Sequence, residues 1–215
     1  MESWPAESIV AWAVETFGPH LTVASSFGAE DMVLIDLIAC HKPPPEVFYL
    51  DTGLFFPETY ALIEDAARHY QLQPLRVAPA LTLAEQAKAF GPALWEKDPD
   101  RCCSLRKVEP LRRHLAGKSA WMTGIRRQQA PTRARARVLE WDARFQLWKV
   151  NPLVYWTTEE VWTYLREHQV PHNPLHHQGY PSIGCMPCTT AVQAGEDLRA
   201  GRWRGQVKTE CGLHQ

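Results

Sequence analysis

Residues 21–40 contain the pattern that most limits how this chain can fold. A short β-branched apolar run, "LTVASS", is followed at once by "FGAEDMVLIDLIAC", in which apolar residues recur at helical spacing. Glu30 and Asp31 fall in the first turn of that helix, where the helix dipole favours negative charge. A strand joined to a helix by a tight turn is the repeating unit of a parallel sheet covered by helices.

The same alternation continues along the chain. Further strands are expected in "EVFYLDTG", "QPLRVA", "SAWMTG" and "LWKVNPL", and further helices in "FPETYALIEDAARHY", "LTLAEQAKAF" and "TTEEVWTYLREH". The last helix has a Thr N-cap with Glu close behind. These patterns predict an α/β fold, with a mostly parallel sheet and helices on both faces. Ligands bind such sheets at the carboxyl ends of the strands, which here carry "SSFGAED", "DTG" and "TGIRRQQ".

Composition narrows the functional classes. A formal net charge of -1 excludes a globally basic nucleic-acid binder. No apolar run reaches the roughly 18 residues of a membrane helix, and the N-terminus carries acids where a signal peptide would be basic. We therefore expect a cytoplasmic protein with no membrane partner. In that compartment its six cysteines are expected to be free, catalytic or metal-binding rather than disulfide-bonded.

Four of the six cysteines form a spaced set. Cys102 and Cys103 are adjacent in "DRCCSLRKVEPL", and Cys185 and Cys188 form a C-x-x-C turn in "GCMPC". Four thiolates suit structural zinc or a 4Fe–4S cluster, and spacing alone does not choose between them. A redox dithiol is the alternative for the C-x-x-C turn, but it leaves the adjacent pair unexplained. Cys40, on an apolar helix, is interpreted as a buried small hydrophobe.

Basic residues gather beside the cysteine pair, after the strand in "SAWMTG" and near the C-terminus. Converging cations favour a ligand with several negative charges. The turn "SSFGAED" adds backbone N–H groups at a helix N-terminus, but it lacks the lysine and paired glycines of a Walker A loop. The basic run "RARAR" is equally typical of a solvated face. The clustered cations are Arg106, Lys107, Arg126, Arg127, Arg199 and Arg202.

Taken together, these segments resemble the assimilatory sulfonucleotide reductases, specifically the bacterial adenylylsulfate (APS) reductases. The matching pieces include "SSFGAEDMVLIDL", "CCSLRKVEPL", "TGIRRQQAPTRA", "PSIGCMPCTTAV" and "KTECGLH", in family order from residue 24 to the end. The resemblance implies an adenine-nucleotide α-hydrolase-like (Rossmann-like) fold. It also implies a nucleotide-binding domain over residues 1–198, which includes the iron–sulfur site, and a mobile catalytic tail over residues 199–215.

The resemblance assigns roles to individual residues. Cys211 is the expected nucleophile: it attacks the sulfur of APS, releases AMP and becomes an S-sulfonate, from which thioredoxin or a glutaredoxin-like reductant releases sulfite. One 4Fe–4S cluster is expected, which replaces zinc as the interpretation, with an electrostatic and structural role. Its ligands are Cys102, Cys103, Cys185 and Cys188. The expected substrate-binding residues are Ser25, Ser26, Lys107, Arg126, Gln129, Arg199 and Arg202.

Alternatives remain at this level. Within the enzyme class, the chain is a reductase of the 3′-phosphorylated nucleotide (PAPS) or of both nucleotides. From another class, it is an iron–sulfur sensor or a tRNA-binding relative that uses "RARAR". The intact "ECGLH" opposes a pure sensor, and the absence of an SGGxDS turn opposes a tRNA-thiolating enzyme. Neither the oligomeric state, for which a homo-oligomer stays open, nor the net effect of neighbouring charges on the pKa of Cys211 follows from the sequence.

Overall fold

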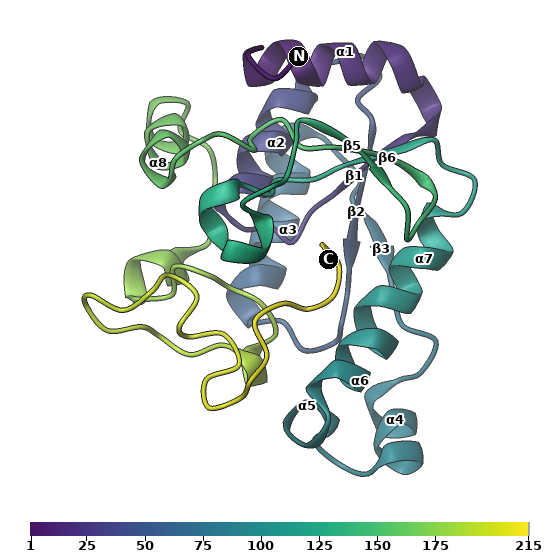
Figure 1. The fold of residues 1–215 in the computed structure, drawn as a ribbon, viewed down its shortest axis with the longest axis vertical. Coiled ribbons are helices and arrows are strands. Elements are labelled where there is room, and N and C mark those ends of the chain that lie inside the picture. Colours follow the sequence, from purple (N-terminus) through teal and green to yellow (C-terminus); the bar gives the residue numbers. More distant parts are fainter. Residues whose placement is uncertain (215) are drawn as a thin grey trace. The chain divides into compact units, whose positions relative to one another are not determined.

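A six-stranded sheet in the order β3-β2-β1-β4-β6-β5 organises the protein, whose computed structural model describes residues 1–214 (Figure 1). Strand β1 pairs in parallel with β2 and β4, β4 pairs in parallel with β6, and β5 pairs antiparallel to β6. The predicted α/β class with a mostly parallel sheet is confirmed. The strands are β1 (Leu21–Ala24), β2 (Glu46–Leu50), β3 (Leu75–Val77), β4 (Ala120–Met122), β5 (Leu139–Asp142) and β6 (Leu147–Val150).

The antiparallel strand β5 was not predicted, because the turn that precedes β6 lacks the usual sequence signal. No Gly or Pro lies between Asp142 and Leu147. Instead, the Asp142 carboxylate accepts hydrogen bonds from the backbone N–H groups of Arg144 and Phe145, and Gln146 adopts a left-handed φ of 59°. A side chain that accepts hydrogen bonds from the backbone N–H groups of its own turn can replace the glycine of a hairpin.

The chain divides into two compact units, each made of separated segments. The first comprises Met1–Tyr49, Ala61–Leu75 and Leu115–Asn173, and the second comprises Leu50–Tyr60, Arg76–His114 and Pro174–Gln215. Residues 199–214 thus belong to a unit that also contains the cysteine pair. The division at residue 198 that the family resemblance implies stays a prediction, and residue 215 of that tail lies outside the described residues.

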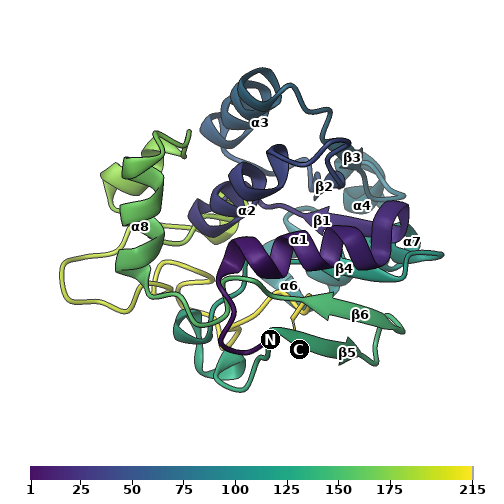
Figure 2. The ribbon, with the colours of Figure 1, turned by 90° about the horizontal axis from the view of Figure 1, so that it is seen from above.

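The helices of the first unit are α1 (Ala6–Phe17), α2 (Ala29–Ala39), α3 (Pro57–Tyr70) and α8 (Thr158–Glu167). Both ribbon views place α2 between α1 and α3 (Figures 1 and 2). Helix α2 contacts α1 and α8, and most of its side chains, from Met32 to Ile38, are buried. A helix that is covered on several sides is apolar around most of its circumference, which explains the apolar sequence of α2. The packing of α2 also fixes the turn before it.

The second unit contains α4 (Leu83–Phe90), α5 (Leu94–Lys97), α6 (Pro99–Cys103) and α7 (Glu109–Leu115), with a π-helical segment, Ser104–Val108, between α6 and α7. Its last part is irregular, as "VPHNPLHHQGYPSIGCMPCTT" predicted. That part contains the two short 3₁₀ turns Pro174–Gln178 and Met186–Cys188. Glycine and proline hold such a segment in turns instead of regular elements.

The interpretation of Cys40 as a buried residue is wrong. Cys40 lies at the C-terminal end of α2 and is exposed, with its thiol hydrogen-bonded to the Leu37 carbonyl at 3.0 Å. The periodic apolar pattern stops one residue earlier, so the helix end turns this side chain to solvent. No helix within residues 1–214 is long and apolar enough to cross a membrane.

Helix α8 begins with a capping box, as predicted. The Thr157 hydroxyl accepts a hydrogen bond from the Glu160 backbone N–H at 3.1 Å, and the Glu160 carboxylate accepts one from the Thr157 N–H at 2.6 Å. Thr157→Ala removes the first of these bonds and is expected to lower the free energy of unfolding by about 1 kcal/mol. Urea unfolding followed by circular dichroism measures this loss.

The matched control is Thr163→Ala, the same chemical change inside the same helix. The Thr163 hydroxyl accepts only an exposed bond from Arg166, and alanine is the better helix former. This variant should leave stability unchanged or raise it slightly. Equal losses in the two variants would contradict the capping role of Thr157.

Candidate active site

Four cysteines line one pocket of the second unit. Cys102, Cys103, Cys185 and Cys188 share its wall with Thr52, Leu54, Trp95, Pro99, Arg106 and Lys107, and the space inside, including the part open to solvent, is about 280 Å³. The structure therefore brings together the four residues that were predicted as one ligand set, although the C-x-x-C turn lies far downstream of the cysteine pair in the sequence.

Local structure explains how the adjacent pair reaches this pocket. Asp98 caps α6 by accepting a hydrogen bond from the Arg101 N–H at 2.9 Å, and Pro99 occupies the first helical position. The cysteine pair ends this short helix, and the π-helical segment follows directly. π-Helical turns are rare and often mark functional sites; this one carries Arg106 and Lys107 into the pocket wall.

Backbone pairing holds the C-x-x-C turn. The Met186 N–H donates to the Leu54 carbonyl at 2.7 Å, and the Trp203 N–H donates to the Cys188 carbonyl at 3.0 Å. The Thr52 hydroxyl lies 3.3 Å from the Cys185 sulfur. The turn is thus attached on one side to the residues after β2 and on the other to the segment that carries Arg202.

A buried arginine ties the same parts together. Arg106 is 4% exposed and donates to the Thr52 carbonyl at 2.5 Å and to the Gln86 side-chain oxygen at 3.0 Å. Sequence reasoning grouped Arg106 with the anion-binding cations. The structure instead gives its guanidinium backbone and amide partners, which satisfy a buried charge.

The pocket presents four thiols, the ligand type of zinc sites and iron–sulfur clusters. Burial, and after it the neighbouring cysteine sulfurs, raise the pKa of Cys102 to about 11 and that of Cys188 to about 12. Thiols in this state need a cationic centre before they lose their protons. However, no group of three or more His, Cys, Asp or Glu side chains in residues 1–214 is arranged so that it could hold a metal ion.

Cys211 belongs to the same unit and is partly exposed. Burial alone would raise the pKa of its thiol, but Lys107, a hydrogen bond from the Leu213 backbone and Arg202 together outweigh that effect and Glu210, so the pKa lies below its ordinary value. A lowered pKa increases the thiolate fraction and hence the nucleophilicity at neutral pH. The net effect of neighbouring charges, which the sequence left open, is thus a downward shift of the Cys211 pKa.

Lys107 is the cation that this arrangement depends on. Burial would lower the pKa of its ammonium group, but the sulfurs of Cys185, Cys211 and Cys103 raise it, and the net shift is upward. Lys107 therefore stays charged in the wall of the cysteine pocket. Its predicted contact with substrate stays a prediction.

The two tail arginines have different partners. The Arg199 guanidinium donates to the Glu210 carboxylate at 3.1 Å and to the Thr209 carbonyl at 2.9 Å. The Arg202 guanidinium makes long hydrogen bonds, to the Ser182 hydroxyl at 3.5 Å and the Ile183 carbonyl at 3.4 Å, and it stacks on Trp203 with 4.5 Å to the ring centre. The predicted substrate roles of both arginines stay predictions.

The turn after β1 belongs to the first unit and binds a carboxylate of its own. The Ser26 N–H and hydroxyl both donate to Asp31, at 2.5 and 2.7 Å, and the Ser25 hydroxyl accepts from the Phe27 N–H at 3.0 Å. Burial raises the pKa of Asp31 to about 6, although the two Ser26 bonds act in the opposite direction. From the sequence, Asp31 was predicted only as an acidic residue that the helix dipole favours. No sequence pattern indicated its hydrogen bonds with Ser26.

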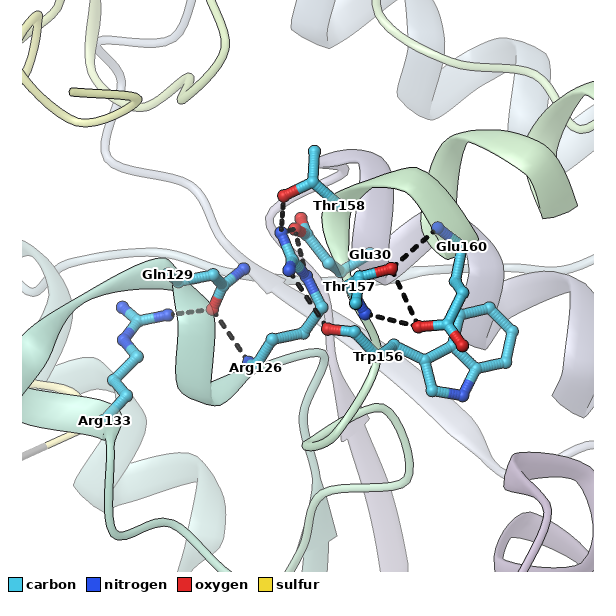
Figure 3. Close-up of polar contacts among 8 residues, drawn as sticks. All are labelled: Glu30, Arg126, Gln129, Arg133, Trp156, Thr157, Thr158 and Glu160. Carbon is cyan, nitrogen blue, oxygen red and sulfur yellow. Dashed lines mark hydrogen bonds and ion pairs between the residues drawn. The ribbon is translucent and has the colours of Figure 1, made fainter. Parts of the chain in front are cut away.

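Arg126 and Gln129 lie after β4 and are engaged within the first unit (Figure 3). One Glu30 oxygen accepts from the Arg126 Nε and Nη2 at 2.9 and 2.7 Å. The same guanidinium donates to the Trp156 carbonyl and the Thr158 hydroxyl, both at 3.2 Å. The Gln129 oxygen accepts from the Arg126 backbone N–H at 3.0 Å and from Arg133. Their predicted contact with substrate stays a prediction.

Comparison with known proteins identifies the family. Residues 20–191 match the family described as "Phosphoadenosine phosphosulfate reductase domain". The chain belongs to this family. The "Adenosine 5'-phosphosulfate reductase" of Staphylococcus haemolyticus is 50% identical over 97% of this chain and 86% of the relative. The predicted sulfonucleotide reductase family, and with it an oxidoreductase that acts on sulfur, is confirmed.

Solved structures agree with this family and with the fold. A crystal structure of the phosphoadenylyl-sulfate (PAPS) reductase of Candida auris, a phosphate complex, superposes with a TM-score of 0.78 at 34% identity, over 88% of this chain and 91% of that one. The FMN adenylyltransferase of Candida glabrata shares the fold alone, with a TM-score of 0.63 at 17% identity over 86% of this chain and 61% of that one. The predicted adenine-nucleotide α-hydrolase-like fold is confirmed.

The segment that carries both tail arginines depends on a close backbone approach at Gly201. A Cβ built there would lie 2.0 Å from the Thr190 carbonyl oxygen, and the Thr190 N–H donates to the Gly201 carbonyl at 2.9 Å. We expect Gly201→Ala to separate the two segments and to destabilise the protein by about 1–3 kcal/mol, a typical cost of overpacking. Thermal unfolding measures this loss.

Gly184→Ala provides the comparison. A Cβ at Gly184 would meet only the guanidinium tip of Arg202, 2.2 Å away, and this long side chain can move. We expect Gly184→Ala to lower reductase activity through Arg202 while costing less stability than Gly201→Ala. A larger stability loss in Gly184→Ala would contradict the assignment of the rigid contact to Gly201.

Proposed function

We propose that this chain reduces adenosine 5′-phosphosulfate to sulfite and AMP, with thioredoxin as reductant and Cys211 as nucleophile. The observation that carries the proposal is the match over 97% of this chain to a 50%-identical relative named for this reaction, and the lowered pKa of the partly exposed Cys211 thiol supports it. An activated cysteine that attacks sulfur is the chemistry that such a reduction requires.

In the first step the Cys211 thiolate attacks the sulfur of the substrate. A sulfur–sulfur bond forms, the bond between sulfur and the bridging oxygen breaks, and AMP leaves with the electron pair. Lys107 and Arg202 are the cations that lower the pKa of Cys211, and they would hold the sulfo group by the same charge. The product is a cysteine S-sulfonate on Cys211.

In the second step a thioredoxin thiolate attacks the Sγ of Cys211. A mixed disulfide forms and sulfite leaves with the electron pair; the second thioredoxin thiol then restores the Cys211 thiol. Both electrons come from the dithiol, which ends as a disulfide. A reducing compartment such as the cytoplasm supplies that reductant and would keep all six cysteines of the chain free, as they are here.

The pocket cysteines would hold one 4Fe–4S cluster, with Cys102, Cys103, Cys185 and Cys188 as ligands. When bound, the cluster would supply charge and structural support without changing oxidation state. Lys107 interacts electrostatically with both the pocket and Cys211, because the sulfurs of Cys103 and Cys185 in the pocket and the sulfur of Cys211 all raise its pKa. It would offset part of the net negative charge of a thiolate-bound cluster while it lowers the pKa of Cys211.

APS is preferred over PAPS as the proposed substrate. The relative named for APS is 50% identical to this chain, whereas the Candida auris PAPS reductase is 34% identical. For the nucleotide end, we retain Ser25, Ser26, Arg126 and Gln129 of the first unit as proposed binding residues. The buried Asp31 that occupies the Ser26 donors would have to release them to a phosphate.

An intact-mass spectrum of anaerobically purified protein, mixed with APS or PAPS and no thioredoxin, tests the nucleophile and the substrate together. We expect the gain of one SO₃ unit with APS, its absence in Cys211→Ser, and its presence in Cys40→Ser. An adduct with both nucleotides would make this a dual-specificity enzyme. No adduct in cluster-loaded protein would contradict the proposal and favour an iron–sulfur sensor.

The cluster is tested separately through iron, sulfide and visible absorbance of the anaerobic protein. We expect Cys185→Ser to lose all three signals, because three remaining thiolates hold a four-iron centre poorly. Cys40→Ser and Cys211→Ser should keep them, since neither residue lines the pocket. Iron retained in full by Cys185→Ser would contradict this ligand set, and absorbance lost during a single turnover would contradict the non-redox role.

A further inference from the structure

Glu210 is a buried carboxylate directly before the nucleophile. Its side chain is 1% exposed, an environment in which an ionised carboxylate is costly unless it is paired. The Arg199 guanidinium supplies the pair, with Nη2 at 3.1 Å from the Glu210 carboxylate. The same nitrogen donates to the Thr209 carbonyl at 2.9 Å. One arginine thus binds both the backbone and the side chain of the two residues that precede Cys211.

Arg199 is itself held in place on its own segment. Its backbone N–H donates to the Asp197 carboxylate at 2.8 Å, and its side chain is 17% exposed. The next turn of this segment is attached to the cysteine pocket, because the Trp203 N–H donates to the Cys188 carbonyl. The pair therefore connects the segment with the nucleophile to a segment that is fixed against the pocket.

We propose that the Arg199–Glu210 ion pair, here called the clasp, fixes the position of Cys211, so that Arg199 is a positioning residue for the nucleophile. The inference rests on the proposed function of Cys211 and deepens it. It assigns different roles to Arg199 and Arg202, both of which the sequence analysis expected to bind the anionic substrate.

The contrast with Arg202 supports this division. The Nε of Arg202 is buried and has no hydrogen-bond partner among residues 1–214, and its other contacts are 3.4 Å or longer. Arg202 retains donor capacity for an incoming oxyanion, whereas the Nη2 of Arg199 already has two acceptors. Arg202 also acts on the pKa of Cys211, and the negative charge of Glu210 opposes it. A cation on Glu210 offsets that opposition.

The pair predicts an asymmetry between its two members. Arg199→Gln removes the cation that pairs with the buried Glu210 carboxylate, which is the costly case. Glu210→Gln leaves a partly exposed guanidinium that still reaches water and the Thr209 carbonyl, which costs less. The double variant has two neutral amides that can bond each other. Adding Glu210→Gln to Arg199→Gln should therefore restore the amide protection and the reaction rate that Arg199→Gln alone lowers.

The test is a double-mutant cycle in the full-length, cluster-loaded enzyme with two readouts. Without substrate, amide hydrogen exchange measures the protection of residues 208–213. Over a range of APS concentrations up to saturation, single-turnover mass spectrometry measures the rate of S-sulfonate formation. We expect Arg199→Gln to lower protection and rate about tenfold or more, Glu210→Gln to lower them less, and the double variant to recover most of both.

Arg202→Gln is the matched control. It should slow S-sulfonate formation, leave the protection of residues 208–213 unchanged, and gain nothing from Glu210→Gln. The clasp is overturned if Arg199→Gln behaves in this way, with unchanged protection and a loss that higher APS concentration repairs, because this is the signature of a substrate ligand.

The two proposals fail distinguishably. If the wild-type enzyme forms no S-sulfonate, the proposed function fails, but hydrogen exchange still decides whether the clasp exists. If Arg199→Gln does not fold, Glu210→Gln alone serves, because a neutral side chain there is not a buried unpaired charge. Unchanged protection of residues 208–213 in Glu210→Gln would then overturn the clasp.

Discussion

The charge on Lys107 is the constraint on which the site depends. Three cysteine sulfurs, from Cys103, Cys185 and Cys211, raise its pKa, and Lys107 in turn lowers that of Cys211. Burial acts against the charged form of both groups, and their mutual attraction opposes it. The pocket and Cys211 are therefore coupled through one ammonium group, and the conformations of α6, the π-helical segment and the C-x-x-C turn place the groups around it.

Much of the fold was predictable because its signals are local. The strand–turn–helix at β1 and α2, the capping box of α8 and the irregular C-x-x-C segment all follow from periodicity or turn chemistry. Strand β5 does not, because the Asp142 carboxylate holds the turn by accepting hydrogen bonds from the backbone N–H groups of Arg144 and Phe145 in place of the usual turn glycine. Cys40 was misplaced for a related reason, since periodicity does not give the residue at which a helix ends.

The site was predictable in its residue types but not in its pairings. Spacing and family resemblance grouped the four pocket cysteines, and they line one pocket. The partner of each cation depends on contacts between distant segments that no local pattern contains. Arg106 bonds a backbone carbonyl, Arg126 bonds Glu30, and Arg199 bonds Glu210. Each of these arginines resembled an anion ligand in sequence and proved to have an internal acceptor.

The second unit is assembled from three separated stretches of chain, with residues 50–60, 76–114 and 174–214 interleaved with the first unit. During synthesis the cysteine pair emerges long before the C-x-x-C turn, and the backbone bond from Trp203 to Cys188 closes later still. The pocket thus stays unfinished until almost the whole polypeptide has left the ribosome. An incomplete translation product therefore contains most strands of the sheet but lacks a complete pocket and Cys211, so any group that binds all four pocket cysteines has to meet a nearly finished chain.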